Sequence, residues 1–380
     1  MRRAVVILPT YNEAANIQPL IERIFQVAQT INARWELHVA VVDSDSPDKT
    51  GQIVKDLISQ YPKLHLITTK KEGLGKAYTT GFKTVMETLQ PYVLFEMDAD
   101  LSHDPQKIPA FLQEIEKGAD FVIGSRYRRG GSIPKDWGID RKIFSISANL
   151  IIRLGFMKPH ITEWTNGYRA IKTWIIKKVL PQIQNYSGYV FQVALLDNAI
   201  KSLAVIREVP IHFVDRKNGV SKINSFQYIV QTFFYVFTHS PFIKYVIVGF
   251  IGFVIDFLFA YLFIHFLHIA KVLANTFSAE IAIIFNFLMN NFWSFKHKKI
   301  VGGMFAYLKK FIFFNVVTSG SIIIQAVGMA VSLALFGDRV YNLLNIISIQ
   351  GWIIYKVFII AFLIIPYSYF MYNKMIWKEK

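Results

Sequence analysis

The last third of the chain is almost free of charge, and this feature most constrains how the chain can fold. Residues 243–380 carry only 12 Lys or Arg and 4 Asp or Glu, whereas residues 1–242 carry 30 and 22. Four apolar segments in this part each exceed the ~20 residues that a helix needs to cross a bilayer. They span about 243–266, 272–295, 310–336 and 346–372. The sequence therefore predicts a soluble-looking domain followed by an all-α domain of four transmembrane helices, rather than four helices of one large soluble core.

The composition agrees with attachment to a membrane. Of the 380 residues, 53% are hydrophobic, which exceeds the share usual in a soluble enzyme. A net charge of +16 would suit nucleic acid or an anionic membrane surface, and the apolar domain favours the membrane. Because the chain has no cysteine, we expect neither a disulfide nor a Cys-ligated metal. The N-terminus runs directly into a strand and does not resemble a signal peptide.

Basic residues concentrate on one side of the predicted helices. The linker between the second and third segments and the C-terminal tail are rich in lysine, whereas the other two linkers hold one basic residue each. By the positive-inside rule, we expect the N-terminal domain, the middle linker and both termini in the cytoplasm, with the protein integral to the cytoplasmic membrane. The residues concerned are Lys296, Lys298, Lys299, Lys309, Lys310, Lys374, Lys378 and Lys380, against Lys271 and Arg339.

Three ionisable residues, Asp256, Glu280 and Lys356, interrupt the apolar segments. Charges within a bilayer are costly and usually face the interior of a helix bundle in pairs. We therefore expect Lys356 to pair with Asp256 or Glu280 and to fix the packing of the helices. A functional polar path through the bundle is the alternative interpretation.

Strands and helices alternate in the N-terminal domain. This order implies an α/β fold with a mostly parallel sheet, whose ligands bind at the carboxyl ends of the strands. Polar clusters follow four of the expected strands, at 11–13, 43–48, 98–104 and 125–126. The expected strands lie near 4–13, 37–50, 64–69, 92–100 and 120–127, and the helices near 14–30, 51–60 and 73–89.

The most specific of these clusters is Asp98-Ala99-Asp100, at the end of the apolar run YVLFEM. Carboxylates at positions i and i+2 leave a strand on the same face, where they can share one hard divalent cation. A nucleotide diphosphate would fill the other positions of that cation and be stabilised as a leaving group. The alternatives are a polar strand end and a helix cap.

Two other kinds of segment bear on a lipid or phosphate substrate. Gly73-Leu74-Gly75 lacks the full dinucleotide or P-loop pattern, so a helix-start turn near the substrate is favoured over direct phosphate binding. The stretches 141–156 and 223–237 combine apolar and polar positions as interfacial helices do. Core packing is an equally good interpretation of the first stretch, whereas the second leads directly into the apolar domain.

Eight short motifs occur in order at workable spacings: PTYNE (9–13), VDSDSPDKT (42–50), GLGKAYTTGF (73–82), MDADLSHDP (97–105), GSRY (124–127), NGYRA (166–170), YVFQ (189–192) and VPIHFVDRKNGVSK (209–222). Together they resemble glycosyltransferase family 2, over roughly residues 4–240. Within that family they resemble the dolichyl-phosphate mannose synthases and related polyprenyl-phosphate sugar transferases. The stretches KYVIVGFIGFVIDF (244–257) and FNFLMNNFWSF (285–295) resemble the GtrA-like four-helix membrane domain.

The resemblance implies a GT-A fold, a nucleotide-sugar donor, Mg²⁺ or Mn²⁺ as cofactor, and inversion at the anomeric carbon. It implies a cytosolic GT-A domain (1–222), an interfacial linker (223–242) and a GtrA-like transmembrane domain (243–380). By matching position, the nucleotide would be bound by Pro9, Tyr11, Glu13, Asp43, Asp45 and Asp98, and the metal by Asp98, Asp100 and Ser102. The acceptor phosphate would be bound by Arg126, Arg141, Lys142, Ser145 and Lys222. The catalytic residues would be Asp100, Arg126, Arg141 and Arg216, the last in a loop expected to close over the site.

The chain departs from the family pattern at three places. Asp43-Ser44 stands where two adjacent aspartates are usual, and Ala194-Leu195 stands where many members have a glutamate. Both changes could shift donor preference. The segment 165–169 reads TNGYR where T-S-G-F-R is common, which is a milder change.

The chemistry of the acceptor decides whether a general base is needed. A lipid phosphate is already an anion near neutral pH, so it needs positioning rather than deprotonation. We therefore assign no catalytic base, although His103 and Asp104 lie near the D-x-D pair.

The function we expect is transfer of mannose from GDP-mannose to a dolichyl-type polyprenyl phosphate at the membrane. Glucose transfer from UDP-glucose to undecaprenyl phosphate is the close alternative. A processive polysaccharide synthase is disfavoured, because such an enzyme is expected to carry a Q-x-x-R-W-type motif and none is found. A lipid-linked sugar translocator is the non-enzymatic alternative, and no nucleic-acid partner is expected.

Overall fold

The computed structural model describes residues 1–188, 190–215, 225–337, 339–343 and 347–377. The chain forms two compact units, Met1–Val236 and Phe237–Lys380. The boundary between them lies inside helix α8 (Ser225–His239), within the segment expected to link the two domains.

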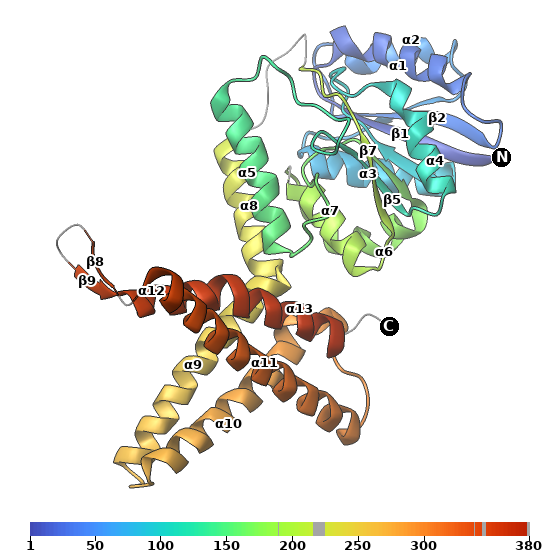
Figure 1. Cartoon of the computed structure of the whole chain (residues 1–380). Coiled ribbons are helices and arrows are strands. Elements are labelled where there is room, and N and C mark those ends of the chain that lie inside the picture. Colours follow the sequence, from blue (N-terminus) through green and yellow to red (C-terminus); the bar gives the residue numbers. More distant parts are fainter. Residues whose placement is uncertain (189, 216–224, 338, 344–346, 378–380) are drawn as a thin grey trace. The chain divides into compact units, whose positions relative to one another are not determined.

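Unit 1 is built on a seven-stranded sheet with the strand order β3-β2-β1-β4-β6-β5-β7 (Figure 1). Its neighbouring strands run parallel except at β6, which is antiparallel to both β4 and β5. The mostly parallel sheet is thus confirmed, whereas β6 and β7 are not among the expected strands. The strands are β1 (Arg2–Thr10), β2 (Trp35–Asp43), β3 (Leu64–Thr68), β4 (Val93–Glu96), β5 (Phe121–Ser125), β6 (Arg169–Lys172) and β7 (Ile206–Pro210).

Helices cover both faces of this sheet. Side chains alternate between the faces along each strand, so the buried strands present apolar side chains to a helical layer on either side. Val6 and Val41 join the core beneath α1 (Ala14–Ala28), α2 (Thr50–Ile58) and α4 (Ile108–Glu116). Ile7 and Val42 face the other layer, where a Cβ added at Gly81 of α3 would lie 2.9 Å from each. That second layer consists of α3 (Leu74–Thr88), α6 (Thr173–Ile183) and α7 (Val190–Lys201).

Two further elements of unit 1 are set apart from these layers. Helix α5 (Ile139–Gly155) ends against α8, since a Cβ at Gly155 would collide with Val236. The short 3-10 helix η1 (Pro105–Lys107) follows the D-x-D loop and leads into α4. The predicted helices over 141–156 and 223–237 are therefore present, the second from Ser225 onward within the described residues.

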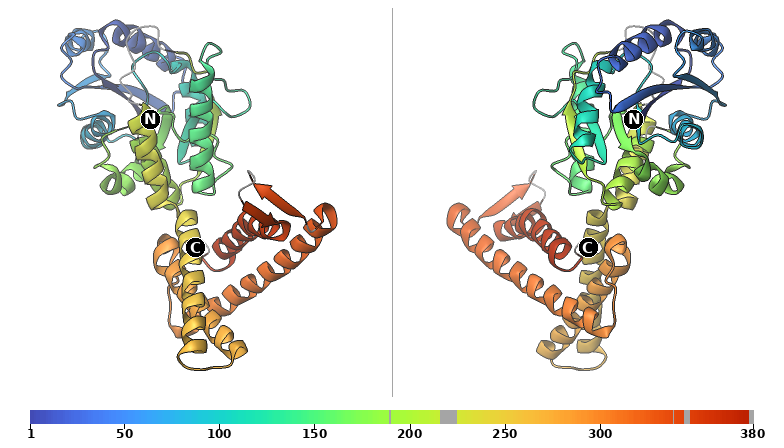
Figure 2. Two further views of the ribbon diagram at one scale, coloured as in Figure 1. Left: turned by 90° about the vertical axis from the view of Figure 1, so that its left-hand side faces the viewer. Right: turned by 90° about the vertical axis from the view of Figure 1, so that its right-hand side faces the viewer.

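Unit 2 is helical apart from one β-hairpin, and α9 and α10 run side by side in it (Figures 1 and 2). The fourth apolar segment begins as a helix at Gly351 and not near residue 346, because the preceding residues pair as strands. The helices are α9 (Pro241–His265), α10 (Lys271–Met289), α11 (Met304–Phe336), α12 (Gly351–Ile359) and α13 (Ile365–Met375). The short turns are η2 (Asn290–Ser294), η3 (Lys296–Lys298) and η4 (Ile360–Ile364), and the hairpin pairs β8 (Val340–Leu343) with β9 (Ile347–Gln350).

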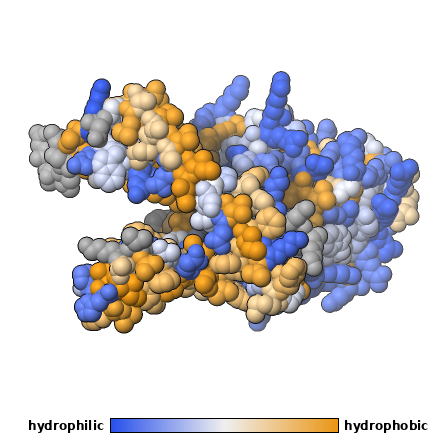
Figure 3. Space-filling model, turned by 60° about the horizontal axis from the view of Figure 1, so that its bottom comes forward, coloured by the Kyte–Doolittle hydropathy of each residue, from blue (hydrophilic) through white to orange (hydrophobic). Residues whose placement is uncertain are grey.

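Three helices among the described residues are long and apolar enough to cross a membrane: α9, α11 and the continuous stretch Ile354–Met375. The predicted second segment forms α10, whose apolar run also contains Asn275, Glu280 and Asn286. On the face shown in Figure 3, apolar side chains gather over unit 2 and hydrophilic ones over unit 1. Unit 2 therefore has the character of a membrane domain.

The ion pair expected for Lys356 is not formed. Within the described residues, no salt bridge joins Lys356 to Asp256 or Glu280. Instead, the Asp256 carboxylate in α9 accepts a hydrogen bond from Ser278 Oγ in α10 at 2.5 Å. A hydroxyl of α10, rather than the ammonium of Lys356, therefore contacts this carboxylate.

Candidate active site

The residues expected to bind the nucleotide begin where β1 and β2 end side by side. Thr10, which follows Pro9 in β1, pairs in register with Asp43 in β2. The Asp43 carboxylate accepts hydrogen bonds from Thr10 Oγ1 at 2.9 Å and from the Ser46 N–H at 3.0 Å. Because Asp43 is only 4% exposed, it ties the two loops together and presents little of its carboxylate to a ligand.

The loop after β1 carries Tyr11 and Glu13. The Lys71 ammonium lies 3.7 Å from the centre of the Tyr11 ring, in a cation–π contact. The Glu13 N–H donates to Thr50 Oγ1 at 3.0 Å, which joins this loop to the start of α2. Asp45 is exposed on the neighbouring turn. This edge of the sheet thus offers an aromatic ring and a positive charge, which suit a nucleotide.

The D-x-D pair lies in a tight loop after β4. The Asp98 side chain is 38% exposed, and Asp100 is 8% exposed. Asp100 Oδ1 accepts the Ser102 N–H at 3.1 Å, and the buried Ser102 Oγ has no hydrogen-bond partner among the described residues. Two carboxylates and a hydroxyl are the oxygen ligands that Mg²⁺ and Mn²⁺ prefer. The residues present therefore fit such a cation.

No group of three His, Asp or Glu side chains in the described part of the chain could hold a metal by itself. Mg²⁺ is usually bound through one or two carboxylates, and phosphate oxygens of the substrate complete its coordination. The two residues that follow the D-x-D pair and Ser102 have structural contacts. His103 is 1% exposed, and Asp104 Oδ1 accepts the Gln106 N–H at 3.0 Å as the cap of η1.

The Gly73-Leu74-Gly75 turn serves close packing. A Cβ at Gly73 would lie 2.5 Å from the Ser187 carbonyl oxygen, and one at Gly75 would collide with the Tyr186 carbonyl oxygen. The Gly75 N–H donates to the Ser187 carbonyl at 2.8 Å. The turn therefore fixes the start of α3 against the segment before α7, as the helix-start interpretation expects.

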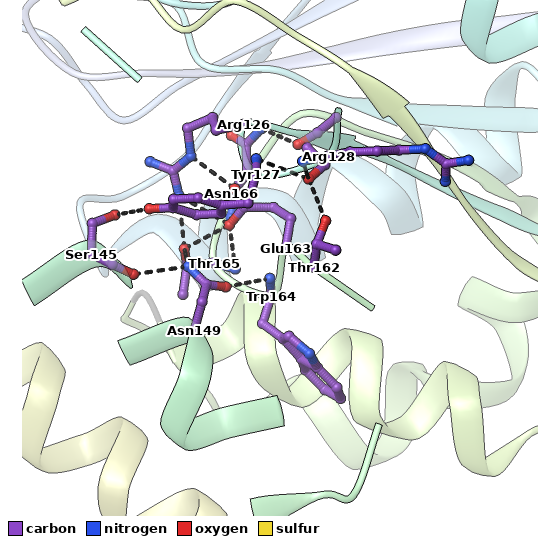
Figure 4. A network of polar contacts seen from close by, with 12 residues as sticks. Arg126, Tyr127, Arg128, Ser145, Asn149, Thr162, Glu163, Trp164, Thr165 and Asn166 are labelled. Carbon is purple, nitrogen blue, oxygen red and sulfur yellow. Dashed lines mark hydrogen bonds and ion pairs between the residues drawn. The ribbon is translucent and has the colours of Figure 1, made fainter. Parts of the chain in front are cut away.

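Arg126 follows β5 and belongs to a dense polar network (Figure 4). Its Nε and Nη2 donate to the two carboxylate oxygens of Glu163 at 2.8 and 3.0 Å, and Nη2 also donates to Thr165 Oγ1 at 3.0 Å. The Arg126 and Glu163 side chains are 9% and 0% exposed. Burial alone would raise the pKa of Glu163, but the charge of Arg126 and the hydrogen bonds from Arg126 and Thr165 outweigh burial and lower this pKa. Arg126 is therefore an ordered cation held by a buried carboxylate.

One face of α5 packs onto this network. Arg141, Ser145 and Asn149 are four residues apart and share that face. Ser145 Oγ lies 2.5 Å from the Tyr127 hydroxyl, and Asn149 Oδ1 accepts the Trp164 N–H at 2.7 Å (Figure 4). The structure thus brings the expected Ser145 close to the residue that follows Arg126.

The other residues expected at the acceptor phosphate differ in placement. Arg141 is half exposed, donates to both carboxylate oxygens of Asp215 at 2.7 and 3.2 Å, and lies 4.0 Å above the Trp137 ring. Lys142 Nζ donates to the Lys135 carbonyl at 2.8 Å. Arg216 and Lys222 lie outside the described residues.

The motifs do not identify Glu163, Asn149 or Glu208, although all three organise the site. The Glu208 carboxylate in β7 accepts the Thr162 N–H at 2.7 Å and the Glu163 N–H at 2.9 Å. Burial raises the pKa of Glu208, an effect that these hydrogen bonds partly offset. The sequence gives only a weak signal for these residues: Glu163 lies two residues before TNGYR, and Glu208 directly precedes VPIHF.

Arg169 of the NGYRA motif is a structural cation. It is fully buried and donates to the carbonyl oxygens of Asn166, Gln192 and Trp164 at 2.7–2.9 Å. Its Nε lies 3.8 Å from Glu96 Oε2. Burial raises the pKa of Glu96 to about 8, and the charge of Arg169 partly offsets this rise. Arg169 thus fixes the loop that carries the partners of Arg126.

Comparison with known proteins agrees with this fold. The family model "Glycosyl transferase family 2" matches residues 5–180, and the model "GtrA/DPMS, transmembrane domain" matches residues 244–377. A dolichol-phosphate mannosyltransferase from Pyrococcus furiosus is 33% identical over 314 residues, which are 80% of this chain and 84% of that protein.

Two bacterial relatives match the N-terminal part. A polyprenol monophosphomannose synthase from Mycolicibacterium smegmatis is 38% identical over 59% of this chain and 82% of its own length. An undecaprenyl-phosphate mannosyltransferase from Micrococcus luteus is 35% identical over 58% of this chain and 88% of its own length. The fold is that of a GT-A glycosyltransferase. The chain belongs to glycosyltransferase family 2, with a C-terminal GtrA/DPMS transmembrane domain.

Proposed function

We propose that this enzyme transfers mannose from GDP-mannose to a polyprenyl phosphate, in a metal-dependent reaction that inverts the anomeric carbon. The observation that carries the proposal is the D-x-D loop, with its two carboxylates and the buried Ser102 hydroxyl, in a chain that also holds Arg126 as an ordered cation. The names of the relatives, all transferases of mannose to prenyl phosphates, support the choice of sugar and acceptor.

The D-x-D loop would bind the donor. Asp98 and Asp100, with Ser102, would hold Mg²⁺ or Mn²⁺ against the diphosphate. When bound, the cation offsets the charge that develops on the departing GDP. Tyr11 and Lys71 would contact the nucleotide, since an aromatic ring and an ammonium group lie together at that edge of the sheet.

The acceptor phosphate would be the nucleophile. One of its oxygens forms a bond to the anomeric carbon while the bond from that carbon to the diphosphate oxygen breaks, and GDP leaves. A bidentate contact from Arg141, beside the positive charge of Arg126, suits a phosphate and would direct one oxygen at the anomeric carbon. The half-exposed Arg141 can exchange its contact with Asp215 for the phosphate, whereas the buried Arg126 is held in place by Glu163.

Two helices would bring the lipid to this site from the cytoplasmic face of the membrane. The outer side of α5 exposes seven large apolar side chains, and α8 exposes four, which is the pattern of interfacial helices. The residues on α5 are Ile139, Ile143, Phe144, Ile146, Leu150, Ile151 and Leu154, and those on α8 are Ile229, Phe233, Phe234 and Phe237.

The proposal is tested by transfer of labelled sugar into organic-extractable lipid. Purified protein is incubated with Mn²⁺, a polyprenyl phosphate and either GDP-mannose or UDP-glucose, beside an Asp100→Ala control. We expect label in the lipid from GDP-mannose, and none in the control. Transfer from UDP-glucose alone would show that the transferred sugar is glucose and not mannose. No transfer from either donor, by folded protein that binds nucleotide, would refute the proposal and favour a translocator.

A further inference from the structure

Buried hydrogen bonds join the metal-binding loop to the loop that holds Arg126. The Asp98 N–H donates to His103 Nδ1 at 3.1 Å, and His103 Nε2 donates to Asn166 Oδ1 at 2.9 Å. His103 and Asn166 are 1% and 5% exposed. Both ring nitrogens of His103 are therefore used, one by each loop.

The direction of each hydrogen bond follows from one carbonyl group. Asn166 Nδ2 lies 2.6 Å from the Gly124 carbonyl oxygen, which can only accept a hydrogen bond. The Asn166 amide oxygen must then face His103, so Nε2 of His103 carries the proton and Nδ1 accepts the Asp98 N–H. The ring is also held by stacking on Tyr168, at 5.0 Å between ring centres. His103 thus has one tautomer and one orientation that satisfy all its neighbours.

The same network continues to Arg126, the arginine proposed to bind the acceptor phosphate (Figure 4). The Asn166 N–H donates to Glu163 Oε1 at 3.2 Å, and that carboxylate holds Arg126 through two hydrogen bonds. His103 and Asn166 therefore stand between Asp98, a proposed metal ligand, and Arg126, a proposed ligand of the acceptor phosphate. Every hydrogen bond along this path is at most 3.2 Å long.

We propose that His103 and Asn166 are positioning residues that couple binding of the metal–nucleotide complex to binding of the acceptor phosphate. This inference rests on the proposed function. If either loop moved alone, a buried hydrogen bond of His103 would break, which is costly. Each ligand therefore stabilises the arrangement that the other needs, and the coupling is reciprocal. The consequence is that the donor is held most tightly when an acceptor phosphate is present.

The coupling is measured as a change in affinity, without turnover. The dissociation constant of GDP is determined for the full-length protein in detergent with Mn²⁺, with and without saturating farnesyl phosphate. For the wild-type protein we expect GDP to bind at least about fivefold more tightly when farnesyl phosphate is present. We expect farnesyl phosphate to gain the same factor when GDP and Mn²⁺ are present, since linkage is reciprocal.

Two substitutions break the path on opposite sides of His103. His103→Asn can still accept the Asp98 N–H but cannot reach Asn166, whereas His103→Gln can reach Asn166 but loses the acceptor near Asp98. In both we expect the coupling factor to fall below about twofold while each ligand alone binds within about threefold of wild type. Tyr168→Phe is the matched control: it removes a buried hydroxyl that donates to the Asp104 carbonyl at 3.0 Å but keeps the stacked ring, so coupling should persist.

Three results would overturn the inference: a wild-type protein in which neither ligand affects the other, a wild-type protein that binds GDP but no farnesyl phosphate, or full coupling in either folded variant. Should His103→Asn fail to fold, His103→Gln gives the same test. The labelled-sugar assay separates this inference from the proposed function. Mannose transfer without coupling refutes only the coupling, whereas coupling without transfer from either donor refutes the proposed function and not the coupling.

Discussion

Buried carboxylates organise this site residue by residue. Asp43 joins the ends of β1 and β2, and Glu163 holds Arg126. Glu208 accepts the backbone N–H groups of Thr162 and Glu163. Each of these three carboxylates has at least one partner on another segment of the chain. Of the residues expected to bind substrates, Asp45, Asp98 and Arg141 are among those that remain at least partly exposed.

Asp100→Asn is expected to reduce transfer about 10²-fold or more, because one charge of the D-x-D pair is lost. The asparagine oxygen can still accept the Ser102 N–H, so the melting temperature should stay within experimental error of wild type. Initial rates with Mn²⁺ and thermal unfolding measure the two effects. Asp104→Asn, at the neighbouring cap of η1, is the control and should keep its activity. Equal losses in both variants would contradict the metal role.

Glu163→Gln is expected to lower the free energy of unfolding by about 3–5 kcal/mol, because the Arg126 cation stays buried without its countercharge. Chemical denaturation followed by fluorescence measures this change. Glu114→Gln breaks the surface pair with Lys117 and should cost less than about 1 kcal/mol. A Glu163→Gln variant as stable as wild type would show that the Arg126–Glu163 ion pair does not stabilise the fold.

The same pair gives a prediction for pH. The pKa of Glu163 is lower in the folded chain than in the unfolded one, so the stability it contributes is present above pH ~4.3 and is lost as the pH falls through its folded pKa. The difference in melting temperature between wild type and Glu163→Gln should be constant from pH 6 to 8 and shrink below about pH 4.3. A difference that persists unchanged to pH 3 would contradict the assignment.

Among the elements, α5 has two opposite tasks. Arg141, Ser145 and Asn149 face the polar network, while the outer side of the helix exposes apolar side chains. The sequence of this helix alone left core packing and membrane contact equally plausible. The exposure of Phe144 (60%) and Ile151 (51%) in unit 1 favours membrane contact.

The double substitution of Phe144 and Ile151 to Ser is expected to raise KM for a long-chain polyprenyl phosphate about tenfold, through loss of roughly 2 kcal/mol or less of apolar burial per side chain in the bilayer. GDP affinity should not change, because none of the residues proposed to bind the nucleotide or the metal lies on α5. The control is Leu203→Ser, another exposed apolar residue of unit 1. Equal KM values for variant and wild type would refute the membrane role of α5.

Five strands of the sheet could be predicted from their apolar runs, and two could not. The β6 strand RAIK has four residues and begins with a buried arginine, so it has no apolar run to find. The β7 strand IREVP holds Arg207, Glu208 and Pro210, which locally argue against a buried strand. Both strands depend on contacts with distant parts of the chain. In β6, Arg169 donates to three carbonyl groups. In β7, Glu208 accepts hydrogen bonds from three donors.

For the whole molecule, the uneven distribution of charge predicts two domains, and the polar clusters predict which edge of the sheet is functional. The arginine–carboxylate pairs could not be predicted, because Arg126 and Glu163 are 37 residues apart and Arg141 and Asp215 are 74 apart. No local pattern marks such partners. They exist only once the sheet has brought its loops together.

The membrane topology is testable because the chain has no cysteine. Single cysteines at Lys299 and His268 would lie in linkers at opposite ends of α10. We expect a membrane-impermeant maleimide to label His268→Cys in intact cells, and to label Lys299→Cys only in inside-out vesicles. Labelling of Lys299→Cys in intact cells would reverse the orientation proposed for the catalytic unit.

In the proposed reaction a lipid phosphate, and not a hydroxyl, attacks the sugar. The most direct measurement compares a polyprenyl phosphate with the matching polyprenol as acceptor, counting GDP released and mannose recovered in lipid. We predict that the phosphate yields one mannosyl lipid for each GDP and that the polyprenol yields none. Equal transfer to the polyprenol, or GDP release without lipid product, would contradict attack by the lipid phosphate.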